Sequence, residues 1–142
     1  MKLLIPVDGS DVSLQAVRHG LRLVAQGLRG EVVLVNVQEP ASLYEWMTLH
    51  DKDALRRVAE EAGQDTLALA EALLRAAAVP YSKEVLVGDP VAMLLEACEQ
   101  HGCEAVIMGS HGTGGLRSAW AGSVSMGLLE KAPVPVTLVR ED

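Results

Sequence analysis

Short β-branched runs alternate with longer helical patterns along this chain, and that alternation constrains its fold more than any other feature. Five runs are rich in Val, Ile and Leu, and most are continuously apolar, as in strands covered on both faces. They are KLLIPV at 2–7, EVVLVNV at 31–37, YSKEVLV at 81–87, EAVIMG at 104–109 and VPVTLV at 134–139. The run at 81–87 is the least apolar, so we expect it to lie nearer an edge of the sheet.

Between the runs, apolar residues recur at steps of three and four, which is typical of helices that pack one face against a sheet. Ser, Asp, Gly and Pro residues at the ends of these stretches act as start and stop signals. The four expected helices run from a cap at Ser10 or Asp11 to Gly30, from Leu55 to Ala78 before Pro80, from Asp89-Pro90 to Gly102, and from near Gly122 to Ala132-Pro133.

The order βαβαβαβαβ predicts an α/β fold, in which a single doubly wound domain over residues 1–142 has a parallel sheet with helices on both faces. Five strands and four helices are expected, and a chain of 142 residues is long enough to bury a core. Segment 40–52 is the one long irregular stretch, and it carries Tyr44 and Trp46. It is either a flap over a site or a surface that packs on a neighbour, and periodicity does not decide between them.

Net charge and hydropathy limit the classes of partner and the cellular compartment that we expect for this protein. The net charge of −7 argues against nucleic acid as a partner, because phosphate backbones need clustered Lys and Arg. No apolar run approaches the roughly 18 residues of a membrane span, and the N-terminus lacks a secretory apolar region of about 7–15 residues. We therefore expect a cytoplasmic protein with no membrane partner. Cys98 and Cys103 lack CxxC spacing, so both are expected to be reduced residues at a helix end.

Glycines gather in residues 108–127, MGSHGTGGLRSAWAGSVSMG, which hold six of the 13 in the chain. In a sheet of this kind, ligands bind beyond the carboxyl ends of the strands, and this segment directly follows the fourth strand. Glycines let backbone N–H groups converge on an anion, and the start of a following helix adds unpaired N–H donors. The segment therefore predicts a phosphate site, the alternative being a long flexible connection.

The spacing sharpens this hypothesis, since Gly109, Gly112, Gly122 and Ser123 read G-x2-G-x9-G-[ST]. That pattern resembles the nucleotide-binding signature of the universal stress protein family, in its ATP-binding branch. The resemblance covers the full chain, in IPVDGSDVS at 5–13, VVLVNV at 32–37, VGDP at 87–90, VIMGSHGTGGL at 106–116 and GSVSMGLLEKAPVPVTLV at 122–139. It implies strand order 3-2-1-4-5 and a homodimer through the last strand, 134–139, whose apolar edge would otherwise be open.

The resemblance also implies which residues surround the nucleotide. These are Pro6, Val7, Asp8, Val37, Met108, Gly109, Ser110, His111, Gly112, Gly122, Ser123 and Val124. Pro6, Asp8 and Val37 would lie around the adenine and ribose, with Asp8 accepting a hydrogen bond from the nucleoside. Met108 and Gly109 would approach the ribose through their backbone. The phosphates would be held at the later positions, namely Gly112, Gly122, Ser123 and Val124.

Three of these positions have other readings. Asp8 could be a local turn acid after the first strand, and Ser123 could be a helix cap. His111 could touch a phosphate when protonated, or it could be an exposed, solvated histidine.

The chain also departs from the family pattern before the final glycine, where residues 118–121, Ser-Ala-Trp-Ala, replace the usual leucines. The bulk of Trp120 could change how the loop closes.

The sequence indicates binding rather than turnover. It lacks the GxxxxGK[ST] loop and any pair of carboxylates spaced for phosphoryl transfer, and His19, His50 and His101 suit surface or packing positions. The leading hypothesis is a regulatory protein that binds ATP, with Mg²⁺ held mainly by the phosphates, and that acts on an unknown downstream protein. At most it would be a slow ATPase.

Two alternatives remain open. VDGSDVS at 7–13 is similar to the SGGxDS loop of adenylating enzymes of the ATP pyrophosphatase type, but it lacks the leading Ser and the second Gly. The other alternative is a dimeric interaction protein of the same fold that binds no nucleotide, for which Trp120 and its flanking alanines are the best support.

Overall fold

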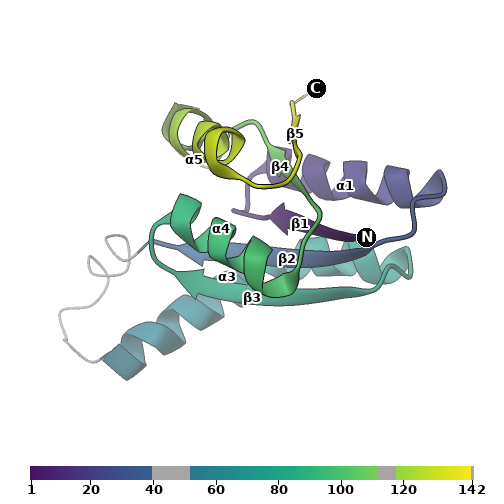
Figure 1. Ribbon diagram of the computed structural model, residues 1–142. Coiled ribbons are helices and arrows are strands. Elements are labelled where there is room, and N and C mark those ends of the chain that lie inside the picture. Colours follow the sequence, from purple (N-terminus) through teal and green to yellow (C-terminus); the bar gives the residue numbers. More distant parts are fainter. Residues whose placement is uncertain (40–51, 112–117, 142) are drawn as a thin grey trace.

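A computed structural model describes residues 1–39, 52–111 and 118–141 of the chain (Figure 1). The side chains of Lys52 and of residues 118–122 lie outside that description, as does the irregular segment 40–51 with Tyr44 and Trp46. The elements are β1 (Lys2–Pro6), α1 (Asp11–Ala25), β2 (Glu31–Gln38), α3 (Lys52–Ala76), β3 (Tyr81–Val87), α4 (Pro90–His101), β4 (Ala105–Gly109), α5 (Ser118–Lys131) and β5 (Val136–Val139).

The strands form one parallel sheet in the order β3-β2-β1-β4-β5, which confirms the predicted topology. β1 pairs with β2 from Lys2 opposite Glu31 to Pro6 opposite Val35. β3 lies at one edge, as its weaker hydropathy predicted, and β5 lies at the other. The α/β fold with helices on both faces is therefore the one that the alternation of runs requires.

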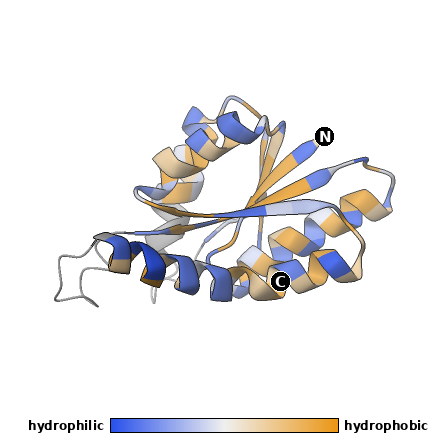
Figure 2. Ribbon diagram, turned by 90° about the horizontal axis from the view of Figure 1, so that it is seen from below, coloured by the Kyte–Doolittle hydropathy of each residue, from blue (hydrophilic) through white to orange (hydrophobic). Residues whose placement is uncertain are grey.

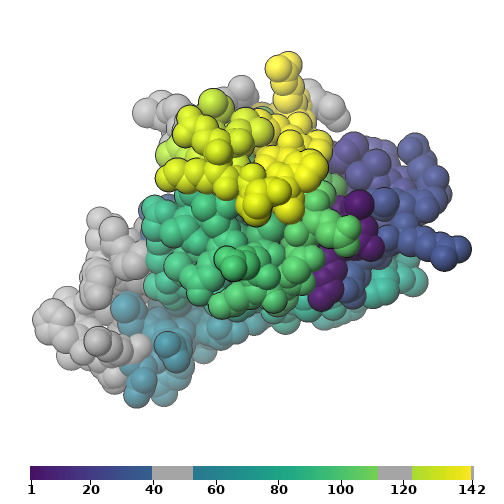
Figure 3. All heavy atoms as spheres, in the orientation of Figure 1, coloured from purple at the N-terminus to yellow at the C-terminus, as the bar shows by residue number. Residues whose placement is uncertain are grey.

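Alternate residues of the strands feed two separate cores. Leu3, Ile5 and Leu34 point toward α1 and α3, whereas Leu4 and Val35 point toward α4 and α5. Figure 2 shows the apolar strands between the helices, whose polar residues turn outward. In Figure 3 the helices of the second layer, α4 and α5, lie on the side of the sheet that faces the viewer. Both faces of the central strands are consequently buried, which explains their continuous apolar runs.

Local capping signals decide where α1 and α4 begin. Ser10 caps α1, since its side chain accepts from the N–H of Ser13 at 3.2 Å. Asp89 caps α4, accepting from the N–H of Ala92 at 3.0 Å, and Gly102 ends this helix in the left-handed conformation at φ 66°. Both predicted starts and the predicted end of α4 are confirmed.

Four other predicted bounds are wrong. α3 begins at Lys52 rather than at Leu55. α1 ends at Ala25 rather than Gly30, because the earlier glycine, Gly27, takes φ 115° and leads the chain out of the helix. α3 ends at Ala76, two residues before Ala78, which takes a φ of 55°. α5 begins at Ser118 instead of near Gly122. Serine suits a helix start and alanine is the best helix former, so residues 118–121 extend the helix toward the N-terminus. Gly122 then lies in the helix interior, where a glycine costs only about 1 kcal/mol relative to alanine.

Within the described residues, no helix is long and apolar enough to cross a lipid bilayer.

Cys98 and Cys103 are free and buried where α4 ends, as predicted. Burial raises the pKa of both thiols, to about 11 for Cys103, where the neighbouring Cys98 adds to the effect. Both thiols are therefore neutral packing groups at physiological pH.

Candidate functional site

The candidate site lies at the carboxyl rim of the sheet, where β1 stands between β2 and β4. From β1 the chain first winds toward β2 and β3, and after β3 it crosses to β4 on the other side of β1. In α/β proteins, ligands bind beyond the carboxyl ends of the strands at the point where strand order reverses in this way. The residues that follow β1, β2 and β4 are therefore the candidate ligand-binding residues.

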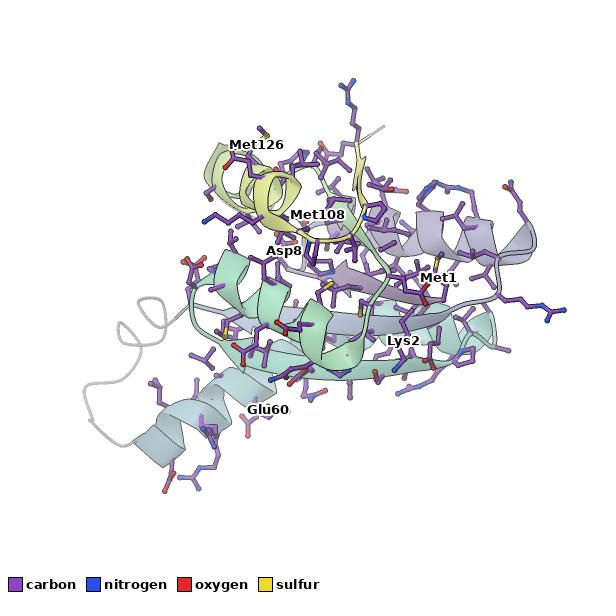
Figure 4. All side chains as sticks on the ribbon, in the orientation of Figure 1. Met1, Lys2, Asp8, Glu60, Met108 and Met126 are labelled. Carbon is purple, nitrogen blue, oxygen red and sulfur yellow. The ribbon has the colours of Figure 1, made fainter. Side chains whose placement is uncertain are left out.

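The turn after β1 is built around Asp8. Its Oδ1 accepts hydrogen bonds from the backbone N–H of Ser10 at 3.0 Å and from the Ser10 hydroxyl at 2.5 Å. Gly9 takes φ 87°, which permits the sharp bend, and the Ser13 hydroxyl donates to the carbonyl of Ser10 at 2.8 Å. Asp8 therefore has the local turn role that the sequence left open. This turn places the half-buried carboxylate at the rim, where Figure 4 labels it.

The end of β2 contributes Val37, which is buried, and a polar residue that sequence reasoning missed. Asn36 is 3% exposed, and its Nδ2 donates to the carbonyl of Val7 at 2.9 Å. Its Oδ1 accepts from Nε2 of Gln38 at 2.6 Å. The available signal was that Asn36 is the single polar residue in the run VVLVNV, at a position predicted to be buried.

The end of β4 lies against the first turn of α1. Met108 is 1% exposed, and Gly109 is buried. A Cβ at Gly109 would lie 2.8 Å from Cγ1 and 3.1 Å from the backbone carbon of Val12. This close approach between β4 and α1 requires a glycine, independently of any ligand. The N–H of Ser110, which is half-buried, donates to the carbonyl of Val139 at 2.8 Å, so the pairing with β5 continues past the end of β4.

His111 is the last residue described before the gap at 112–117, a gap that contains Gly112. Its Nε2 lies 3.3 Å from Oε2 of Glu141, and the side chain is 16% exposed. The reading of His111 as an exposed, solvated histidine is therefore wrong, because residues that follow β5 partly cover it. The Nδ1 atom is buried without a hydrogen-bond partner among the described residues.

The predicted phosphate residues Gly122, Ser123 and Val124 lie inside α5 rather than at its start. In a helix that begins at Ser118, the N–H groups of its first turn are the unpaired ones, and those from Gly122 onward donate to preceding carbonyls. The expectation that unpaired donors start at Gly122 is thus wrong for this conformation. Val124 packs with Val37 and Met108 in the buried layer beneath α4 and α5, so these three predicted residues do come together.

A charge cluster around a buried carboxylate lies away from the rim, where α3 packs on β3. Glu71 is 5% exposed and accepts hydrogen bonds from Tyr81 at 2.9 Å, Lys83 at 3.1 Å and Arg75 at 3.2 Å. Burial alone would raise the pKa of this carboxyl, but the hydrogen bonds and the charges of Lys83 and Arg75 outweigh it and lower the pKa. The cluster fastens α3 to the edge strand. Among the described residues, no group of three or more His, Cys, Asp or Glu could hold a metal ion.

Comparison with known proteins places this geometry in a family. The sequence profile of the universal stress protein family matches residues 1–140. The universal stress protein MJ0531 of Methanocaldococcus jannaschii is 28% identical over 140 residues, covering 99% of this chain and 82% of the relative.

Solved structures share the fold. The structure of MJ0577 superposes with a TM-score of 0.83 at 24% identity, covering 99% of this chain and 96% of the other. A family protein from Arabidopsis thaliana with bound AMP has a TM-score of 0.68 at 15% identity, covering 100% and 92% of the two chains. A universal stress protein in complex with cAMP has a TM-score of 0.66 at 21% identity, covering 98% and 95%.

Proposed function

This chain belongs to the universal stress protein family, and from that premise we propose that it is a cytoplasmic regulatory protein that binds ATP at the carboxyl rim of its sheet, with little or no hydrolysis. The observation that carries the proposal is the rim itself. The turn at Asp8 and the end of β4 at Gly109, which the glycine-rich segment follows in the sequence, lie at adjacent strand ends where strand order reverses. Adenine nucleotides bound to two relatives of the same fold support the ligand class.

The two ends of the nucleotide would use different chemistry. At the nucleoside end, the buried residues Pro6, Val7 and Val37 would supply apolar contacts, and Asp8 would supply a carboxylate that accepts from the ribose or the base. Met108 and Gly109 end β4, and Ser110 is the next residue. All three would approach the sugar through their backbone. These groups come from three adjacent strand ends, so a flat nucleoside could contact all of them together.

The phosphate end would lie over Gly112, Gly122, Ser123 and Val124, with His111 beside it. Backbone N–H groups from Gly122 onward donate within α5 in the described conformation. Binding of a triphosphate by these amides therefore requires the turn at 118–121 to unwind, and this would move the positive end of the helix toward the phosphates. Mg²⁺ would be held mainly by the phosphate oxygens and water.

Calorimetry with Mg²⁺ and ATP tests the site. We expect Ser123→Ala, which removes a hydroxyl, to weaken ATP binding by about tenfold, the equivalent of one lost charge-assisted hydrogen bond. We also expect Gly122→Ala to weaken binding, because the added methyl would stand where the backbone must approach the phosphates. Ser82→Ala is the matched control, because Ser82 is an exposed serine on the edge strand β3. Unchanged affinity in both rim variants would exclude this phosphate site. Release of ADP, or of pyrophosphate with an acceptor, would show turnover in place of simple binding.

A second part of the proposal is a homodimer through residues 134–139, which include β5, and this dimer would act on an unknown downstream protein. β5 is an edge strand, and the neighbouring helix α5 exposes Met126 at 49% and Leu129 at 45%. Apolar side chains beside an open strand edge favour association with a second copy. Light scattering should give a dimer for the native chain and a monomer for Leu129→Glu.

The same surface favours the competing reading, a dimeric interaction protein that binds no nucleotide. Extraction of the purified protein for adenine nucleotide separates the two. A dimer that carries no nucleotide and does not bind added ATP would support the competing reading.

A further inference from the structure

Asn36 stands out in the core of the sheet as a buried carboxamide among valines. Its neighbours Val35 and Val37 are 0% and 8% exposed, and Asn36 itself is 3% exposed. A buried amide is costly unless its donors and acceptors are paired, so a valine would serve the strand at lower cost. We therefore expect the Asn36 amide to do more than fill space in the core.

The Asn36 side chain takes over where the β1–β2 ladder ends. The last register pair is Pro6 with Val35, after which the N–H of Val7 donates to the carbonyl of Val35 at 2.9 Å. Nδ2 of Asn36 then donates to the carbonyl of Val7, also at 2.9 Å. Both backbone groups of Val7 are thus tied to β2, one through the main chain and one through this side chain. The next residue is Asp8.

Gln38 fixes which way the Asn36 amide faces. Its Nε2 donates to Oδ1 of Asn36 at 2.6 Å, and a carboxamide that accepts on one side presents its NH₂ donor on the other. The backbone of Gln38 is held in turn, because its carbonyl accepts from the N–H of Gly88 at 3.0 Å. We call this chain of hydrogen bonds, from Gly88 through Gln38 and Asn36 to Val7, the amide relay.

The amide relay ends on the peptide that joins Val7 to Asp8. Rotation of that peptide would move the Asp8 carboxylate, which is anchored on its far side by the two hydrogen bonds from Ser10. Asp8 is therefore held from both directions, by α1 through Ser10 and by β2 through Asn36. Precise placement of this kind is what a binding carboxylate requires, because a small displacement removes a hydrogen bond.

We propose that Asn36 is a positioning residue for the nucleoside end of the site, which sets the Val7–Asp8 peptide so that the Asp8 carboxylate faces the ribose or base. The inference rests on the proposed function for its ligand. The relay itself lies within the described protein and can be tested without a nucleotide.

Asn36→Asp tests the proposal, because it keeps the shape of the side chain and replaces the donor to Val7 with an acceptor. We expect ATP affinity to fall by about tenfold or more. Competition by inorganic tripolyphosphate, which lacks the nucleoside, should change by less than about twofold. Asn36→His should recover part of the ATP affinity, since an imidazole N–H can donate to the same carbonyl. Gln38→Leu frees the amide to flip and should give an intermediate loss.

Val33→Ala is the matched control, because Val33 is 2% exposed on the same strand and faces the other layer. It should lower stability without changing the ratio of ATP to tripolyphosphate affinity. In nucleotide-free protein, the amide resonances of Asp8 and Ser10 should shift in Asn36→Asp and not in Val33→Ala.

Equal losses for ATP and tripolyphosphate, or unmoved Asp8 and Ser10 resonances, would overturn the proposal. If the native chain binds no ATP, the proposed function fails by itself. In that case the resonances alone decide whether the relay sets the position of Asp8.

Discussion

Gly109→Ala tests the close contact between β4 and α1 at the carboxyl rim of the sheet. The loss of stability that it should cause follows from the packing of Gly109 against Val12. The added methyl carbon would lie 2.8 Å from Cγ1 and 3.1 Å from the backbone carbon of Val12. Carbon atoms pack best at about 3.5–4.0 Å, so α1 and β4 must separate by roughly 0.5 Å or more. The backbone carbon cannot turn aside as a side chain can.

Two opposing free energies set the expected result. Alanine in place of glycine in a strand stabilises by about 0.5–1 kcal/mol through the unfolded chain. Overpacking in a tight interior costs about 1–3 kcal/mol, so we expect a net loss of about 1–2 kcal/mol. For a chain of 142 residues this corresponds to a fall in Tm of about 3–8 °C.

Urea and thermal unfolding followed by circular dichroism measure this loss. Val12→Ala removes both Cγ atoms that the new methyl would meet, so the double variant should lose about 1 kcal/mol less than the sum of the single variants. The rest of the penalty should persist, because the backbone carbon of Val12 remains. A Gly109→Ala protein as stable as the native one, or strict additivity, would refute the close approach of β4 to α1.

Three further predictions concern the other packed contacts. Gly63→Ala gains about 1 kcal/mol of helix propensity but places a Cβ in steric conflict with the side chain of Val85, so a net loss in urea unfolding is expected; a net gain would contradict that packing. Cys103, whose pKa burial raises to about 11 from 9.0, should react with iodoacetamide only in urea, and stability should fall as pH rises from 9.0 toward about 11, because the unfolded thiol ionises first. Glu71 has a lowered pKa, so its contribution to stability is present above pH 4.5 and lost as pH falls below it; Glu71→Gln should flatten this acid dependence in urea titrations, and an unchanged slope would contradict it.

The helices and strands whose bounds were predicted correctly are those defined by signals close to them in the sequence. Strands were predicted within one or two residues, because burial on both faces demands a continuous apolar run. The bounds of α4 were also predicted, since Asp89, Pro90 and Gly102 act within one helical turn of themselves. The end of α1 and the start of α5 were missed, because several residues at each place could begin or end a helix.

At the candidate site too, some features could be predicted from the sequence and others depend on strand pairing. Glycine spacing and the position after β4 pointed to the rim, and the contacts of the predicted residues with a nucleotide stay a prediction. The sequence could not show that Asn36 bonds to Val7, because the two are 29 residues apart and meet only when β1 and β2 pair. It equally could not show that Glu141 lies against His111, since that contact depends on β5 pairing with β4.

Hydrophobic periodicity and capping residues by themselves determined that this chain forms a doubly wound parallel sheet, because they act over a few residues and each run must be buried. Tertiary structure alone decided the details of the rim. There, Gly109 makes room for Val12 and an amide from β2 holds the turn of β1, since those contacts form only after strands distant in sequence lie side by side.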